Sequence, residues 1–369
     1  MITNNVFALL YALIGFGLLI TVHEFGHFIF CKIFNINTPT FSIGMGPKIL
    51  ERKIGQTNFR LSLIPIGGYV EIAGLSEVGQ GEQKMATLTG EGSFAQKPFW
   101  QKFFVLTGGV VFNLLFAYIV YSSLFFVGIP KKSVTILITE QKKYSQIAQT
   151  FNLQAKDQII SINNQELSPE PNNALKILKE QLIIPLNKLQ KDSIQLVILR
   201  DNKNINITVS SQDKESSENI LKLLELKSQD IPGEFEKYNL IDSVIKGIET
   251  TNNWIKQMFM GIIYLIKSKS LSGAGGPIMI LSKTFETAQK GFIPLLLFLA
   301  FISINLAIIN ILPLGALDGG QLLFAGIEAV IRREIPEIIK ASINIASWVL
   351  LLSLILYLTY KDILNIFVK

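Results

Sequence analysis

The chain contains two histidines, His23 and His27, and they lie four residues apart in the run His-Glu-Phe-Gly-His. In an α-helix, side chains at this spacing project from the same face, so both imidazoles can bind one metal ion. A glutamate directly after the first histidine, Glu24, is the usual general base of such a zinc site. We therefore interpret His23 and His27 as ligands of Zn²⁺. The alternative is a pair of histidines that neighbouring helices satisfy by hydrogen bonds.

The histidine pair follows an apolar stretch of membrane type. Residues 6–22 carry no charge, and three further uncharged stretches, 103–130, 291–313 and 341–360, are about long enough to cross a bilayer. Hydrophobic residues make up 49% of the 369 residues and charged residues 17%, which is too apolar for an ordinary soluble protein. Ionisable side chains inside a membrane are costly and are seldom without function, so the metal-binding interpretation is favoured.

The basic residues predict how the four spans are oriented. Basic residues are present in the loop between spans one and two and in the loop between spans three and four, which places both loops in the cytoplasm. Both termini and the long middle segment then lie outside, and the histidines lie toward the cytoplasmic side. The residues used are Lys48, Arg52, Lys53, Arg60, Lys84, Lys97, Arg332, Arg333 and Lys340. The net charge of +6 is spread along the chain and does not indicate nucleic acid binding.

Two regions outside the spans have strand-like patterns. Residues 41–72 combine β-forming residues with glycine pairs, which predicts short strands and hairpin turns. The charge-poor part, 61–70, is a candidate to re-enter the membrane beside the histidines, and 76–92 reads as a polar loop. Residues 133–212 contain alternating β segments and one helical stretch, 173–182, which predicts a small β-rich module outside the membrane.

These patterns divide the chain into four parts. Residues 1–130 form an N-terminal membrane part with spans one and two, and 133–212 form the β-rich module. Residues 213–290 contain a charged linker and an amphipathic helix, 241–266, which we place on the outer membrane surface. The alternative for that helix is a fifth span. Residues 291–369 form a C-terminal membrane part with spans three and four.

A catalytic zinc site usually has three protein ligands, so a third is expected. No further histidine exists and the single cysteine, Cys31, does not fit, which leaves a carboxylate. Asp318 is the first charged residue after Lys290 and follows Pro313, which breaks or bends the third span. An unpaired carboxylate there is costly, so a partner is expected. The alternative is that Asp318 is the N-cap of a helix at 321–331.

The second span contains small residues and one buried-type polar residue. Gly108 and Gly109 allow a neighbouring helix to approach closely, and Asn113 can hydrogen-bond across the helix bundle. Asn113 is therefore interpreted either as a bond between helices or as a residue beside the metal.

Several of these motifs together resemble the site-2 protease family of membrane-embedded zinc metalloproteases, and in particular its bacterial regulator-of-sigma-E protease branch. The resemblance covers nearly the whole chain. The similar segments are HEFGH at 23–27, GGYVEIAG at 67–74, FAQKPFWQKFFVLTGGVVFNLLFA at 94–117, LSGAGGPI at 271–278 and NILPLGALDGG at 310–320. The region DQIISINNQEL at 157–167 resembles part of a PDZ domain, although Asn152 and Lys156 stand where glycines are usual.

The resemblance implies a polytopic α-helical membrane protein. It implies about four transmembrane helices, a membrane-associated β-hairpin region and one extracytoplasmic, β-rich PDZ-like domain. By position it makes His23, His27 and Asp318 the Zn²⁺ ligands and Glu24 the general base.

The resemblance also assigns residues to the substrate. Asn310 and Pro313 become part of the substrate-contacting segment, and Asn113 is a further candidate for substrate binding. Two positions depart from the family pattern. Gly315 stands where many relatives have a second proline, and Gln321 stands where many have a histidine. Neither belongs to the implied ligand set.

The expected activity is hydrolysis of peptide bonds within transmembrane segments, after a first cut by another protease. The expected partners are membrane lipid and single-span proteins such as anti-sigma factors or signal-peptide remnants, and nucleic acid is not expected. The expected location is the bacterial inner membrane, with several spans. A non-catalytic scaffold with a PDZ-like binding module is one alternative. A metal transporter is another, although transporters often have internal repeats and this sequence shows none.

Overall fold

The computed structural model describes residues 2–75, 90–138, 154, 157–167, 193–200, 203–210, 224–268, 271 and 275–367. The predicted helix at 173–182, most of the predicted loop at 76–92, and Asn152 and Lys156 lie outside these residues. The chain divides into two compact units, Met1–Val127 with Lys237–Lys369, and Gly128–Glu236.

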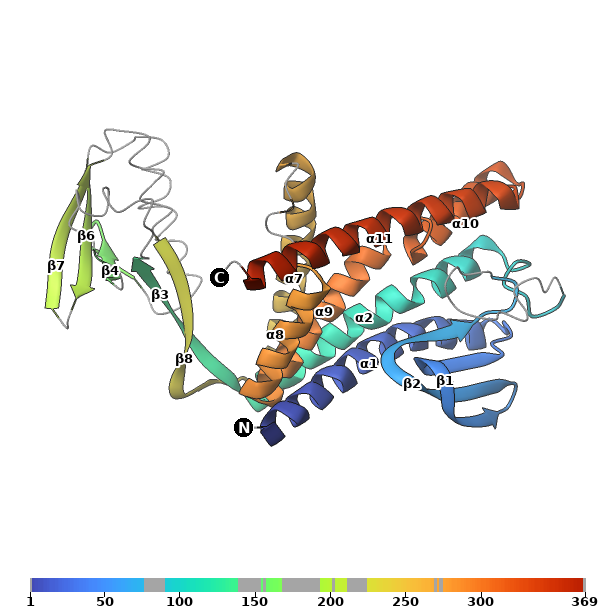
Figure 1. The fold of residues 1–369 in the computed structure, drawn as a ribbon, viewed down its shortest axis with the longest axis horizontal. Coiled ribbons are helices and arrows are strands. Elements are labelled where there is room, and N and C mark those ends of the chain that lie inside the picture. The colour runs from blue at the N-terminus through green and yellow to red at the C-terminus, as the bar shows by residue number, and fades with distance from the viewer. Residues whose placement is uncertain are drawn as a thin grey trace. The chain divides into compact units, whose positions relative to one another are not determined.

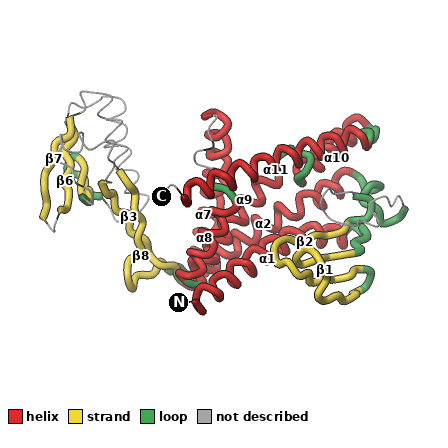
Figure 2. Tube along the Cα trace, in the orientation of Figure 1, coloured by secondary structure: helices red, strands yellow, loops and turns green. Residues whose placement is uncertain are grey.

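The first unit is mainly helical (Figures 1 and 2). Its described helices are α1 (Ile2–Ile33), α2 (Phe99–Val127), α7 (Leu240–Ser268), α8 (Pro277–Lys290), α9 (Phe292–Asn310), α10 (Asp318–Ile331) and α11 (Glu337–Phe367). Among the described residues, four helices are long and apolar enough to cross a membrane, and they are α1, α2, α9 and α11. This agrees with the four spans predicted from the sequence.

Helix α2 is central to the first unit because it contacts α1, α7, α9 and α10. It ends at Val127, earlier than the predicted limit of 130, because Gly128 has a φ of 111° and the chain continues as a strand. Helix α7 contacts α2 at Gly247, which lies against Ser122, and Tyr118 of α2 donates a 2.6 Å hydrogen bond to Asn252. Its position relative to the bilayer stays a prediction.

Two long strands, β1 (Thr40–Ile54) and β2 (Thr57–Glu71), form an antiparallel sheet beside α1 (Figure 1). The prediction of several short strands here was wrong. Each strand is continuous and bends at glycines with positive φ, such as Gly44 at 86° and Gly67 at 109°. Thr40 pairs with both Asn58 and Glu71, so β1 begins between the two ends of β2. The last residues of β2 therefore form an edge of this sheet next to α1.

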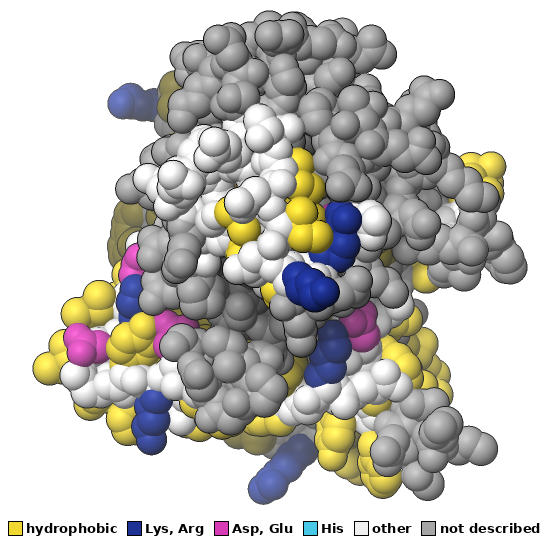
Figure 3. Space-filling view, turned by 90° about the vertical axis from the view of Figure 1, so that its left-hand side faces the viewer, with side chains coloured by type: hydrophobic (Ala, Val, Ile, Leu, Met, Phe, Trp, Pro, Cys, Tyr) yellow, Lys and Arg dark blue, Asp and Glu magenta, His cyan; other side chains and the backbone are white. Residues whose placement is uncertain are grey.

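The second unit contains one antiparallel sheet in the order β7-β6-β4-β3-β8, with β5 paired to β4. Its strands are β3 (Ile129–Ile138), β4 (Gln158–Ile162), β5 (Gln165–Glu166), β6 (Ser193–Arg200), β7 (Lys203–Ser210) and β8 (Leu224–Glu236). Figure 3 is a view of the whole chain and not of this unit alone; the described side chains visible in it include hydrophobic, basic and acidic ones. A β-rich module is thus present, while its identification as a PDZ domain stays a prediction.

The charged linker predicted at the start of residues 213–290 is a strand in its described part, because β8 begins at Leu224. This strand pairs with β3 from Ile129, opposite Glu236, to Ile138, opposite Leu224. The charged composition suggested a linker, but backbone pairing with a strand distant in the sequence determines the conformation.

Candidate metal centre

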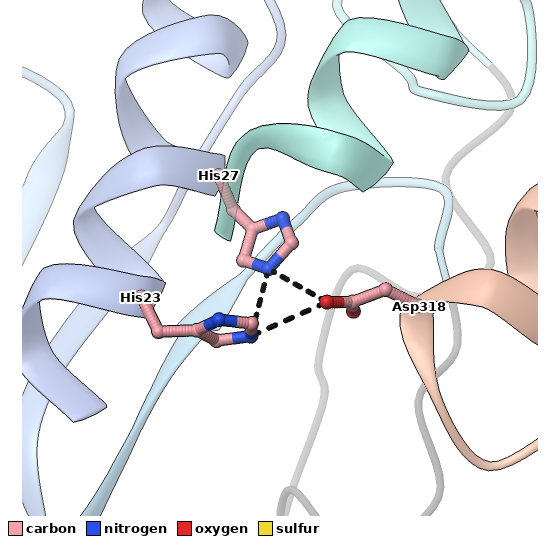
Figure 4. A group of neighbouring side chains, drawn as sticks. All are labelled: His23, His27 and Asp318. Carbon is pink, nitrogen blue, oxygen red and sulfur yellow. Dashed lines mark hydrogen bonds and ion pairs between the residues drawn. The ribbon is translucent and has the colours of Figure 1, made fainter. Parts of the chain in front are cut away.

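Three side chains from opposite ends of the chain meet in the first unit (Figure 4). His23 and His27 project from α1 toward Asp318, which is the first residue of α10. The Nε2 atoms of the two histidines are 3.2 Å apart. Asp318 Oδ2 lies 3.3 Å from His23 Nε2 and 3.5 Å from His27 Nε2. The predicted constellation is therefore brought together as one nearly equilateral triangle.

The size of this triangle fits a tetrahedral zinc ion. With Zn–N and Zn–O bonds of about 2.0–2.1 Å, two ligand atoms of a tetrahedral site lie about 3.3 Å apart. The three observed separations of 3.2, 3.3 and 3.5 Å match that value. A set of two imidazole nitrogens and one carboxylate oxygen is also a usual donor set of catalytic zinc.

Asp318 does not act as a helix cap. The N-cap position of α10 is Leu317, and the helix start has no capping hydrogen bond from a side chain. Asp318 Oδ2 is fully buried and has no hydrogen-bond partner, which is costly unless a cation compensates. The capping alternative is thus not what this geometry supports.

The ring of His27 is oriented by the backbone of α2. Its Nδ1 lies 2.7 Å from the carbonyl oxygen of Val105, in a buried contact. A carbonyl oxygen can only accept, so Nδ1 carries the proton and Nε2 keeps its lone pair. That is the tautomer a metal-binding Nε2 requires.

The ring of His23 contacts Asn113, which is completely buried. The Asn113 side-chain nitrogen lies 3.2 Å from His23 Nδ1, whereas its oxygen Oδ1 has no hydrogen-bond partner. The two amide orientations of asparagine are assigned from such networks. Turning the amide places Oδ1 as acceptor for an Nδ1–H group, which pairs the orphan oxygen and leaves His23 Nε2 free to bind metal. Ser303 of α9 donates a 2.9 Å hydrogen bond to the main-chain carbonyl oxygen of Asn113. This bond holds the Asn113 residue in place beside His23.

Glycines let α1 and α2 approach until their backbones touch. A Cβ atom on Gly26 would collide with the carbonyl oxygen of Gly108, and one on Gly109 would collide with the rings of His23 and His27. The sequence identified Gly108 and Gly109 as small residues, but their direct position against the histidines was not predicted. This contact places both imidazoles next to α2.

Glu24 lies beside the edge of the β1–β2 sheet. Its Oε2 accepts a 3.2 Å hydrogen bond from the backbone N–H of Val70 in β2. The sequence did not predict this contact or the one between His27 and the Val105 carbonyl oxygen. Both use backbone groups, which are present in every residue and therefore cannot be recognised from residue types.

The two predicted substrate-contacting residues have different surroundings. The Asn310 side-chain nitrogen is 3.3 Å from His23 Nε2. Pro313 is exposed and lines an apolar groove of about 710 Å³ with Gly319, the residue after Asp318. The other lining residues are Phe99, Leu322, Leu323, Gly326, Ile327, Ala329, Val330 and Ile331.

A glutamate beside a cluster of two histidines and one aspartate, among helices that can span a bilayer, defines the class of membrane zinc metalloproteases. The chain belongs to peptidase family M50, the family of the site-2 proteases, whose profile matches residues 11–354.

Curated relatives agree with this assignment. The chain is 28% identical over 362 residues to a Clostridium perfringens protein named "putative zinc metalloprotease", covering 96% of this chain and 98% of the relative. A Campylobacter jejuni protein with the same description is 29% identical over 359 residues, with 94% and 91% covered. A Helicobacter pylori relative is 30% identical over 349 residues, with 91% and 93% covered. The protein is a membrane metalloprotease and its cofactor is Zn²⁺.

Proposed function

We propose that this metalloprotease hydrolyses peptide bonds within transmembrane segments of other membrane proteins. One observation above all supports the proposal, which is the triangle of His23, His27 and Asp318 on and beside membrane-type helices. We assign these three residues as the zinc ligands. Glu24, next to His23 on α1, is assigned as the general base.

Bound by His23, His27 and Asp318, Zn²⁺ would supply Lewis-acid activation of a water molecule at near-neutral pH. Glu24 takes a proton from that water as its oxygen attacks the peptide carbonyl carbon, and then delivers the proton to the leaving nitrogen, so that the C–N bond breaks. The Val70 N–H group orients the Glu24 carboxylate for both transfers. Asn310, close to His23 Nε2, is assigned to stabilising the carbonyl oxygen as negative charge develops on it.

A transmembrane helix must unwind before it can be cut, because its carbonyl groups are otherwise hydrogen-bonded within the helix. Exposed backbone in lipid costs several kcal/mol per unpaired group. The edge of β2 next to Glu24 can pair with an extended substrate segment by strand addition. The contact between Val70 and Glu24 supports this assignment, because it brings that edge to the proposed base. Pro313 and its apolar groove are assigned to the apolar side chains of the substrate.

Asn113 is assigned as an orienting partner of His23 on the strength of their contact. Its role in substrate binding stays a prediction.

The remaining parts of the proposal concern location and partners. We place the protein in the bacterial inner membrane, with both termini and the second unit outside the cytoplasm and the zinc site toward the cytoplasmic side. The second unit then acts as a PDZ-like docking surface or size filter. This arrangement favours single-span substrates that another protease has already shortened, such as anti-sigma factors or signal-peptide remnants.

The decisive experiment compares Glu24→Gln with wild-type protein in cleavage of a single-span membrane substrate, with zinc content measured in parallel. We expect Glu24→Gln to retain zinc and to lose about 10²–10⁴-fold in cleavage rate. Glu249→Gln is the matched control, because it makes the same chemical change on the exposed surface of α7. A scaffold or a metal transporter does not need the base, so wild-type cleavage by Glu24→Gln would contradict the proposal.

A further inference from the structure

Helix α11 makes few contacts along its length but carries a small number of buried polar side chains. Only 6% of its most apolar 18-residue stretch is buried. The buried polar residues on α11 are Asn344, Ser347 and Asp362. In an apolar helix that otherwise faces outward, buried polar groups mark the places where it is attached to the rest of the fold.

Asn344 and Ser347 contact the loop that leads into Asp318. This loop, residues 311–317, reads Ile-Leu-Pro-Leu-Gly-Ala-Leu and has no side chain able to hydrogen-bond. Its backbone groups at membrane depth must therefore find partners elsewhere in the protein. The N–H group of Gly315 donates a 2.9 Å bond to Ser347 Oγ, and its carbonyl oxygen accepts a 2.8 Å bond from Gln321. Both polar groups of the Gly315 residue are thus satisfied by side chains of α10 and α11.

Asn344 also lies against Gly315 and Gln321. Its Oδ1 lies 3.5 Å from the Gln321 side-chain nitrogen. A Cβ atom on Gly315 would lie 2.5 Å from Asn344 Oδ1 and 3.2 Å from the Asn344 backbone nitrogen. The two positions where the sequence departs from the family pattern, Gly315 and Gln321, therefore bond to each other and pack against α11.

The loop at 311–317 packs tightly against the first residues of α10. A Cβ on Gly319 would collide with the carbonyl oxygen of Ile311, and one on Gly320 would collide with that of Leu314. The backbone of Leu317 also donates a 2.8 Å bond to Leu314. A displacement at Gly315 is therefore passed directly to Asp318, three residues later.

We propose that Ser347, Asn344 and Gln321 are positioning residues that hold the Asp318 carboxylate at the distance the zinc site requires. The inference rests on the proposed role of Asp318 as a ligand. The hydrogen bonds of Ser347 and Gln321 go to the backbone of Gly315, so these residues act through the loop.

The test measures zinc retention of the purified full-length protein against a chelator, together with the visible spectrum of the cobalt-substituted protein. Ser347→Ala removes the acceptor for Gly315 and is expected to weaken metal retention about 10-fold and to shift the cobalt bands. Ser347→Thr keeps the hydroxyl and is expected to restore both. Gln321→Ala, which leaves α11 unchanged, provides a second variant with the same expected direction.

Asp362→Ala is the matched control at the other attachment of α11. Asp362 accepts hydrogen bonds from the backbone of Gly276 at 3.2 Å and Met279 at 2.8 Å, and so fixes α11 to the start of α8. This variant is expected to retain metal like the wild type. Equal metal loss in Asp362→Ala and Ser347→Ala would overturn the proposal, because general docking of α11 would then explain both. Wild-type metal retention in both Ser347→Ala and Gln321→Ala would also overturn it.

Asp318→Asn distinguishes failure of the proposed zinc ligand set from failure of the proposed positioning role. Normal zinc retention in that variant means that the proposed ligand set has failed. Zinc loss in Asp318→Asn with wild-type retention in Ser347→Ala and Gln321→Ala means that only the positioning role has failed.

Discussion

Asp157 in the second unit and Asp318 in the first unit each have a buried carboxylate oxygen, but the surroundings are opposite. Asp157 in the second unit is met by Arg200, whose Nε and Nη2 donate bonds of 2.8 and 2.7 Å, and by the Gln154 N–H group at 2.8 Å. Asp318 in the first unit has a buried Oδ2 without any donor and faces two imidazole nitrogens. The chain itself neutralises the charge of Asp157, whereas Asp318 requires a cation from outside. A buried carboxylate with all its partners is explained by structure alone, whereas a buried and unsatisfied oxygen requires a further explanation, such as a bound cation.

The strongest test of this contrast is Asp318→Asn. The neutral amide is a poor zinc ligand, so we expect zinc affinity to fall by more than about 100-fold, beyond the range of residues that only support a ligand. Chelator competition on the purified protein measures this change. Zinc affinity equal to that of the wild type would show that Asp318 is not a zinc ligand, and the contrast with Asp157 would then have no functional meaning.

Gly109→Ala tests whether the histidine side of the site depends on backbone contact. The new methyl group would meet the rings of both His23 and His27, so we expect nearly complete loss of zinc. Gly261→Ala on α7 is the matched control, because nothing lies within 4 Å of its Cβ position. That substitution is expected to be neutral for zinc and stabilising by up to about 1 kcal/mol in a helix. Normal zinc content in Gly109→Ala would show that α1 and α2 can move apart enough to accept the methyl group without loss of metal binding.

Asn113→Ala tests the unsatisfied oxygen behind His23. Loss of the orienting partner is expected to lower zinc affinity about 10- to 100-fold. Asn113→Asp sharpens the test, because a carboxylate can only accept from the His23 Nδ1–H group. Retained zinc in Asn113→Asp supports an accepting oxygen, and a loss as large as in Asn113→Ala would favour the opposite amide orientation.

Arg200→Ala tests the structural aspartate and is expected to have the smallest effect on the metal. Removing Arg200 leaves Asp157 buried without its cation, which costs about 3–5 kcal/mol of stability in the second unit. Thermal unfolding or limited proteolysis of the second unit measures that loss. Zinc content is expected to stay at the wild-type level, and a clear decrease would show that the two aspartates are not independent.

The sequence predicted the α1 side of the site better than the α10 side. His23, Glu24 and His27 lie on one helix, so their relative placement follows from helical periodicity alone. Asp318 was a candidate with a capping alternative, because its direction depends on how a loop of apolar residues packs. The start of α10 has no side-chain capping bond, which favours the ligand interpretation over the capping one.

Other features could not be predicted because they depend on contacts between distant parts of the chain. The Val105 carbonyl and the Val70 N–H group are backbone atoms, which every residue has. Strand β8 forms because β3 is its partner, although its own composition resembles that of a linker. The four membrane-type helices were predictable because continuous apolar length is a local property of the sequence.

The origin of the three triangle residues has a consequence for biogenesis. Residues 1–127 already contain both histidines, the Val105 carbonyl that orients His27 and the Asn113 side chain next to His23. Asp318 is translated only after the whole second unit has been made. A nascent or truncated chain therefore presents a half-site with two nitrogen donors and no carboxylate. With the proposed ligand set, the zinc site is complete only after α10 has been synthesised and has packed against α2.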